Sequence, residues 1–312
     1  MAKAQPERRK QLFSQVEACD RDVEAAHKGS DDHQLLVALE KSLHLRRKLF
    51  AEDSPEIMAA SQKVCQGYNR VATSLLAEGE LKAARQLLQR AEEVAKEPLC
   101  CAMTWNNLAC FFRKSNKNRS AVAYLEQALA VEERYGHSAA AQTHLNLCAT
   151  LSQLQRHSEA LQQAQRALVR IYEALAPRLC EKEEEVKLKE EVPLLCVAYH
   201  NQGVEQEFLR CPEAALQAYA QGTWWACKFL GTSHQLAKLL HHAAESAKAK
   251  VPSDAPIMAR VEPLLSPYKP GKPYAVDRPF LGLLSPHQGL PGAGDKTHAV
   301  VSLSEAKRQT SA

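Results

Sequence analysis

The sequence predicts an all-α fold, an α-solenoid of about five helix pairs. Two compositional observations favour helices. Hydrophobic residues make up 45% of the 312-residue chain and glycine only 12 positions, so a large helical core can be buried. Strong helix formers dominate, and we see no long alternating run of Val, Ile and Thr of the kind that marks strands. The third observation is a helix–turn–helix pattern that recurs along the chain.

The pattern is clearest in residues 104–132, TWNNLACFFRKSNKNRSAVAYLEQALAVE. Its first half presents one helical face at positions i, i+3, i+4 and i+7, formed by Trp105, Leu108, Ala109 and Phe112. The polar stretch KSNKNRS then breaks the period with residues that suit turns and caps. A second helical face follows, formed by Ala121, Leu125 and Ala128. Small residues on these faces let two helix backbones approach closely.

Three other stretches follow the same template. The first helix presents large, large, small and large residues, a turn follows, and the second helix presents small, large and small residues. Their first helices contribute Tyr68, Val71, Ala72 and Leu75; His144, Leu147, Cys148 and Leu151; and Tyr199, Gln202, Gly203 and Gln206. Their second helices contribute Ala84, Leu88 and Ala91; Ala160, Ala164 and Ala167; and Ala215, Tyr219 and Gly222. We expect these positions to form the core, with His144 as a packed histidine.

This template resembles the tetratricopeptide repeat, a helix–turn–helix unit with the pattern W-x2-L-G-x2-Y…A-x3-F…A. The resemblance covers about residues 30–230. The second-helix alanines at 84, 121, 160 and 215 are 37, 39 and 55 residues apart, whereas the usual period is about 34. Such long repeats resemble those of kinesin light chains. The stretch SLHLRRKLFAEDSPEIMAASQ at 42–62 is similar to a repeat junction of that type, with Ser54 as N-cap and Pro55 opening the next helix.

The chain is expected to have three regions. Residues 1–52 form a degenerate helix pair, with helices near 6–28 and 31–50. Residues 53–250 form the solenoid, which ends in an amphipathic cap helix near 234–250 that covers the last apolar face. At least one of Trp224 and Trp225 is expected to pack against this cap. In the alternative interpretation, an exposed tryptophan side chain anchors a binding partner. The charged insertion at 179–193, LCEKEEEVKLKEEVP, is a helix extension or solvated excursion, or alternatively an acidic docking element.

Residues 251–312 are expected to form a Pro-rich, largely disordered tail. Within it, SPYKPGKPYAVDRPFLGLLSP at 266–286 alternates basic, aromatic and proline residues. Two interpretations stay open for this segment. It lies loosely on the solenoid, or it is a short linear motif that docks on another protein, since polyproline-like segments lose little entropy on binding.

Charge and hydropathy limit which kinds of partner the chain is expected to bind and in which compartment we expect it. The formal charge of +4 and the pI near 8.5 are far from the basic stripe of a dedicated nucleic-acid binder. The N-terminus lacks the apolar core of a signal peptide, and no apolar run approaches the roughly 18 residues of a membrane helix. We therefore expect no nucleic-acid or membrane partner, and a cytoplasmic location.

The reactive residues do not form a recognisable catalytic or metal-binding pattern. The ten cysteines contain no C-x-x-C pair and no zinc spacing, so reduced thiols are expected. The sequence has no P-loop, G-x-S-x-G, dinucleotide-binding glycine pattern or H-E-x-x-H. His241 and His242 are adjacent on a helix and point about 100° apart. We predict no enzyme activity, no cofactor and no metal.

The resemblance implies a concave groove lined by the first helices, in which extended peptides are held. The positions one and two residues beyond the core aromatic are Asn69 and Arg70, Asn106 and Asn107, Leu145 and Asn146, and His200 and Asn201. An amide can bond both groups of a peptide backbone. One turn further, Arg113 and Lys114 add positive charge, which Glu207 opposes. The predicted partner-binding residues are Arg70, Asn107, Arg113, Lys114, Asn146 and Asn201.

The sequence therefore predicts a non-catalytic adaptor or scaffold that binds an extended, acidic or mixed protein segment. Some of these amides could instead tie neighbouring repeats together, or the tail could fill the groove. Thr73 and Cys110 stand where chaperone-binding members have a clamp Asn, which argues against chaperone C-termini as ligands. The alternative function is a structural component of a cytoskeletal, ciliary or motor-associated assembly, whose basic tail lies on acidic tubulin of microtubules.

Overall fold

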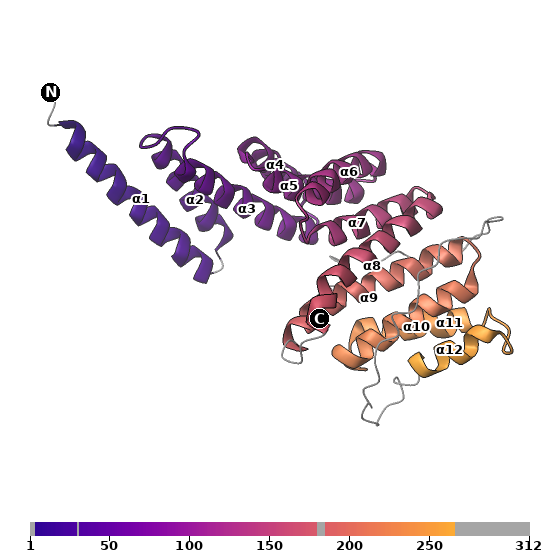
Figure 1. Ribbon diagram of the computed structural model, residues 1–312. Coiled ribbons are helices and arrows are strands. Elements are labelled where there is room, and N and C mark those ends of the chain that lie inside the picture. The colour runs from indigo at the N-terminus through magenta and orange to yellow at the C-terminus, as the bar shows by residue number, and fades with distance from the viewer. Residues whose placement is uncertain (1–3, 30, 180–184, 266–312) are drawn as a thin grey trace. The chain divides into compact units, whose positions relative to one another are not determined.

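The computed structural model describes residues 4–29, 31–179 and 185–265 (Figure 1). Within these ranges the chain forms twelve α-helices and no strand, which confirms the predicted all-α class. It divides into two compact units, unit 1 (Met1–Tyr135) and unit 2 (Gly136–Ala312). None of the helices in the described ranges is long and apolar enough to cross a bilayer.

Unit 1 consists of three helix pairs, and each helix packs on the next one along the chain. Its helices are α1 (Ala4–Gly29), α2 (Asp32–Arg47), α3 (Pro55–Glu78), α4 (Leu81–Val94), α5 (Pro98–Lys114) and α6 (Asn118–Arg134). Besides the sequential contacts, α3 packs directly on α5. This contact between first helices of successive pairs is what stacking of repeats produces.

Unit 2 has the same organisation. Its helices are α7 (Ala140–Gln153), α8 (His157–Leu179), α9 (Glu185–Phe208), α10 (Pro212–Phe229), α11 (Gln235–Lys248) and α12 (Pro256–Leu265). The first helices α7, α9 and α11 pack side by side, while α10 packs on α9 and α11. Two stacked pairs, followed by α11 and α12, thus bury one continuous core.

The repeat template accounts for the core. All second-helix positions of the template are buried, and the alanines among them have no exposed surface. The predicted helix start is also confirmed, because the Ser54 side chain accepts a hydrogen bond from the Ile57 amide and Pro55 opens α3. His144 is a packed histidine, with its ring 2.7 Å from the Gln163 side-chain oxygen.

The turns between the paired helices of the four template repeats use the same backbone conformation. Gly79, Asn116, Gln155 and Arg210 have left-handed φ values between 57° and 90°. The next residue donates its amide proton to a carbonyl five positions earlier, as Arg156 does to Leu151. This arrangement caps the first helix and reverses the chain. Three of the four residues are not glycine, so these turns carry a modest conformational cost.

The C-terminal end of the solenoid is longer than the sequence predicted. Residues 256–265, which we expected within the extended tail, form α12 and pack on α10. Its buried residues are Ile257, Val261 and Leu265. Apolar residues at this helical spacing find a partner surface on α10, and this outweighs the prolines nearby. The rest of the tail, including 266–286, lies outside the described residues.

Two further predictions concern unit 2. Residues 185–193 of the charged insertion form the N-terminal part of α9, which agrees with the interpretation of the insertion as a helix extension. Residues 180–184 lie outside the described ranges. Trp225 is buried in the core that also contains Leu236 and Leu240 of the cap helix α11, as expected. Trp224 is only partly buried, and the Lys228 ammonium lies 4.6 Å from its ring centre.

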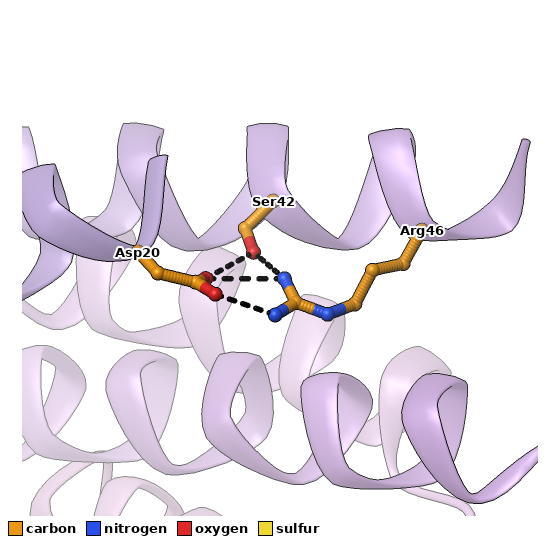
Figure 2. Close-up of polar contacts among 3 residues, drawn as sticks. All are labelled: Asp20, Ser42 and Arg46. Carbon is orange, nitrogen blue, oxygen red and sulfur yellow. Dashed lines mark hydrogen bonds and ion pairs between the residues drawn. The ribbon is translucent and has the colours of Figure 1, made fainter. Parts of the chain in front are cut away.

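A polar cluster joins the first two helices of unit 1 (Figure 2). Asp20 on α1 accepts hydrogen bonds from the two terminal guanidinium nitrogens of Arg46 on α2, at 3.1 and 2.7 Å. Ser42 adds a third bond to the same carboxylate at 3.0 Å and also contacts Arg46. Burial alone would raise the pKa of Asp20, but the bonds from Arg46 and Ser42 outweigh it and hold that pKa below its usual value.

Candidate functional site

In unit 1, two of the predicted binding residues are engaged within the repeats. The Asn107 amide donates to the Asn69 side-chain oxygen at 2.7 Å, so it ties α5 to α3. Asn69 in turn donates to the Thr104 hydroxyl at 2.8 Å and to the Cys65 carbonyl at 2.9 Å. Arg70 forms an ion pair with Asp32 on α2. The Asn107 amide therefore links two neighbouring repeats through this hydrogen bond.

The other two predicted cations of unit 1, Arg113 and Lys114, lie in the last turn of α5. Positive charge there is favoured by the negative end of the helix dipole. Arg113 is 8% exposed and Lys114 is partly exposed, so the two differ in access to solvent. The positive charge predicted for this face is therefore carried by one buried and one accessible side chain.

In unit 2, the helices α7 and α9 bury an unusual number of polar side chains. On α7 these are Thr143, His144, Asn146, Thr150 and Ser152. On α9 they are His200, Asn201, Gln202, Glu205 and Gln206. The two helices pack on each other. The predicted residues Asn146 and Asn201 thus belong to adjacent first helices, with exposed fractions of 6% and 0%.

The polar groups of α9 are not fully paired. Both side-chain atoms of Asn201 lack a hydrogen-bond partner, as do the side-chain carbonyl oxygens of Gln202 and Gln206 and one oxygen of Glu205. A buried polar atom without a partner costs about 1–3 kcal/mol, and native proteins contain few of them. We call Asn201, Gln202 and Gln206 the α9 amide cluster. This cluster has unmet capacity to donate and accept hydrogen bonds.

Glu205 is the ionisable group at the centre of this region. Its other carboxylate oxygen lies 2.8 Å from Nδ1 of His157 at the start of α8, and the His157 ring stacks on Phe208 at 4.1 Å. Burial raises the pKa of Glu205 above its ordinary value, although hydrogen bonds from Ser152 and His157 oppose this shift. The pair holds α8 against α9. In the described residues, no group of three or more His, Cys, Asp or Glu side chains is placed to hold a metal ion.

The sequence contained a signal for the α9 amide cluster that the prediction did not use. Gln202 and Gln206 occupy template positions that are apolar in the other repeats, as Leu108 and Phe112 are. A polar residue in a core position points to a hydrogen-bonding role, but the predicted set included only Asn201. Asn69 was missed as a structural residue because its partner Asn107 lies 38 residues away.

Comparison with known proteins agrees with this architecture. The model of the tetratricopeptide repeat family matches residues 101–138, which include most of α5, all of α6 and the residues that follow. This segment is a tetratricopeptide repeat. Tetratricopeptide repeats generally mediate protein–protein interactions, because stacked helix pairs present extended binding surfaces. A search of curated proteins finds no significant match.

Several solved structures are similar to this chain at low sequence identity. BtubC (BKLC) from P. vanneervenii is 15% identical, with a TM-score of 0.43 over 89% of this chain and 99% of that one. Pseudomonas aeruginosa pilF is also 15% identical, with a TM-score of 0.41 over 83% and 96%. A putative kinesin light chain with nearly identical TPR-like repeats from Podosopora anserina is 19% identical, with a TM-score of 0.38 over 70% and 96%.

Proposed function

We propose that this chain is a non-catalytic adaptor that binds an extended protein segment along the first helices α7 and α9 of unit 2. The observation that carries this proposal is the α9 amide cluster, whose buried groups have unmet hydrogen-bonding capacity. A carboxamide offers donors and an acceptor, which match the carbonyl and amide groups of a peptide backbone. An extended segment is the ligand that presents such groups in a row.

Binding at this face requires a local rearrangement. Asn146, Gln202 and Gln206 are 6%, 6% and 9% exposed, and Asn201 is fully buried. A segment must therefore enter between side chains of the face. Association that needs such an opening is slower than the roughly 10⁵–10⁷ M⁻¹s⁻¹ of preformed sites. Slow association is an expected property of this adaptor.

The first experiment compares the partners of the wild-type chain with those of an Asn201→Leu, Gln206→Leu variant by proximity labelling in cells. The matched control is Gln162→Leu, which makes the same kind of change at an exposed position of α8. We expect a defined set of partners to be lost in the double variant and kept in the control. The melting temperature of the double variant must not fall below that of the wild type, because leucine removes unpaired buried amides.

An unchanged partner list with an unchanged melt would contradict the proposal and favour a purely structural role for the amides. A chain that ends at residue 265 tests the alternative in which the C-terminal tail fills the binding face. If truncation increases association with the same partners, the tail competes for the face. If truncation has no effect, the tail does not cover it.

The repeat spacing favours a second candidate function, a structural role in a cytoskeletal, ciliary or motor-associated assembly. Helices α3, α8 and α9 are 23 or 24 residues long, and the repeat periods of 37 and 39 between positions 84, 121 and 160 resemble those of kinesin light chains. This proposal predicts co-sedimentation with microtubules that weakens as salt screens the +4 charge. No co-sedimentation at low salt would exclude direct microtubule binding.

A further inference from the structure

The unpaired side-chain atoms at Glu205 and in the α9 amide cluster are mostly hydrogen-bond acceptors. Four buried oxygens lack a partner, and they belong to Asn201, Gln202, Glu205 and Gln206. The only buried nitrogen of these residues without a partner is the amide nitrogen of Asn201. A peptide backbone presents N–H and C=O groups in equal number, proline apart. Backbone contacts alone therefore leave part of this acceptor capacity unmet.

These four residues share one side of α9. Asn201 and Glu205 are four positions apart, and so are Gln202 and Gln206. Gln202 and Glu205 are three positions apart. Residues at these spacings are neighbours on a helix, with Cβ atoms about 5–6 Å apart. One ligand group can therefore reach several of the unpaired oxygens at once.

The chemistry of the unpaired atoms divides them into two sets. The Asn201 side chain has both an unpaired donor and an unpaired acceptor, so it matches the backbone of an extended segment. The unpaired atoms of Gln202, Glu205 and Gln206 are all oxygens, which require donors. Lysine and arginine are the side chains that carry several donors and no acceptor. The second set therefore fits a basic side chain of the ligand.

The charge of Glu205 also favours a cation. Its side chain is fully buried, and in the described part of the chain its only ion-pair partner is the ring of His157. An imidazole is charged only when it is protonated, so Glu205 has no permanent cation beside it. An ionised carboxylate in the interior is costly unless it is paired, and burial accordingly raises the pKa of Glu205. A ligand cation would compensate this charge.

The carboxylate at this place is specific to α9. The position of Glu205 in the repeat template, six residues beyond the first large residue, is occupied by Ser74, Phe111 and Thr150 in the other copies. Three of the four helix pairs thus pack without a charged group there. A buried charge that the repeat fold does not require points to a binding role.

We propose that the segment bound along α7 and α9 places an arginine side chain against Glu205, an inference that rests on the proposed function and specifies its ligand. The guanidinium pairs with the free carboxylate oxygen and donates to Gln202 and Gln206, while Asn201 bonds the backbone of the same segment. Arginine fits better than lysine, because a guanidinium is more weakly hydrated and its planar fork of donors serves several acceptors. Of the acidic and mixed segments expected from the sequence, this selects a mixed one.

The test begins by panning the full-length chain against a library of random peptides displayed on phage. Peptides that the wild type retains and the Asn201→Leu, Gln206→Leu variant does not retain are the ligands of the α9 face. We expect these ligands to share an arginine at one position of their common motif. Ligands of this face without a shared arginine would overturn the inference and leave the proposed function standing. Finding no such ligand would overturn both.

The best ligand is then synthesised with arginine or with citrulline, its neutral analogue, at the shared position, and affinities are measured by fluorescence anisotropy. We expect citrulline to weaken binding to the wild type by about 30-fold or more, because it leaves a buried carboxylate unpaired. Equal affinities of the two peptides would overturn the inference without any change to the chain.

A variant of the chain assigns the arginine preference to Glu205. In Glu205→Gln, which keeps the shape of the side chain and removes its charge, the preference for arginine over citrulline should fall at least about tenfold. Glu173→Gln is the matched control, because it removes the same charge at a 58% exposed side chain of α8, and it should keep the full preference. A preference that is undiminished in a folded Glu205→Gln chain would overturn the assignment to this carboxylate. If Glu205→Gln fails to fold, the comparison of the two peptides on the wild type decides the inference.

Discussion

Replacing Gly203 by Ala is expected to destabilise unit 2 by about 1–2 kcal/mol, although alanine is the better helix former. Gly203 is a small template position on α9. A Cβ atom there would lie 2.4 Å from Cε1, 2.6 Å from Cζ and 2.7 Å from Cδ1 of Tyr219. Carbon atoms normally approach to about 3.5–4.0 Å. The Tyr219 ring would have to move by about 1 Å.

The ring has little freedom to make that movement. Tyr219 is almost fully buried, and its hydroxyl donates to Glu207 at 3.1 Å. Overpacking of this kind costs about 1–3 kcal/mol, and a rigid aromatic obstacle favours the upper part of that range. Alanine recovers about 1 kcal/mol of helix propensity. The difference is the net loss of about 1–2 kcal/mol.

The assay is urea unfolding of the full-length chain, followed by far-ultraviolet circular dichroism. A loss of this size also lowers the melting temperature by about 2–4 °C for each kcal/mol in a unit of this length. Gly29→Ala is the control, because a Cβ at Gly29 meets nothing within 4 Å. In a Tyr219→Leu background the same Gly203→Ala change should become neutral or stabilising, a coupling that a double-mutant cycle measures.

Two results would refute this reasoning. One is a Gly203→Ala chain as stable as the wild type, which would mean that the α9–α10 interface relaxes freely. The other is an equal loss in both backgrounds, which would place the cost somewhere other than the Tyr219 ring.

Three further predictions concern backbone and charge. Arg210→Gly should stabilise unit 2 by about 0.5–1 kcal/mol in urea unfolding, because φ is 58° at this position. Asn116→Gly should increase stability by less, since asparagine tolerates the left-handed conformation. Equal increases for the two variants would contradict this steric explanation. Asp20→Asn should cost about 0.5–1 kcal/mol at neutral pH, a surface-pair magnitude. Because folding lowers the pKa of Asp20, the wild type should lose this advantage as pH falls below about 3.8, and a pH-independent difference in urea midpoints would refute the ionic account. Folding raises the pKa of Glu205, so the wild type should lose stability relative to Glu205→Gln as pH rises above 4.5. Urea midpoints that change with pH in parallel for the two chains would contradict this prediction.

The fold was largely predictable because the repeat signal is local. Alternating large and small residues at helical spacing mark the faces that must be buried, and the template positions of all four copies are indeed core or near-core. Caps follow the same logic, as Ser54 and Pro55 show. The prediction failed at α12, where a short apolar helix lies among prolines. Its formation depends on the surface of α10, which sequence periodicity does not report.

The candidate site was only partly predictable. The sequence located the first-helix positions, but it could not distinguish the Asn107 amide, which is bonded to Asn69, from the Asn201 amide, which lacks a partner. Both are asparagines two residues beyond a core aromatic. Their difference arises from the side chains that the adjacent helix brings to each of them.

The sequence by itself determined the helix pairs, the small positions at which they touch and the absence of a recognisable catalytic pattern. The helix pairs and their contact positions depend on residues three to seven positions apart, and such residues share a helix face whatever the tertiary structure is. Only the tertiary structure decided which polar groups are paired, as Asn69 and Asn107 are across 38 residues, and which remain unmet on α9. Hydrogen bonds act over a few ångströms, so they depend on the register in which separate helices pack.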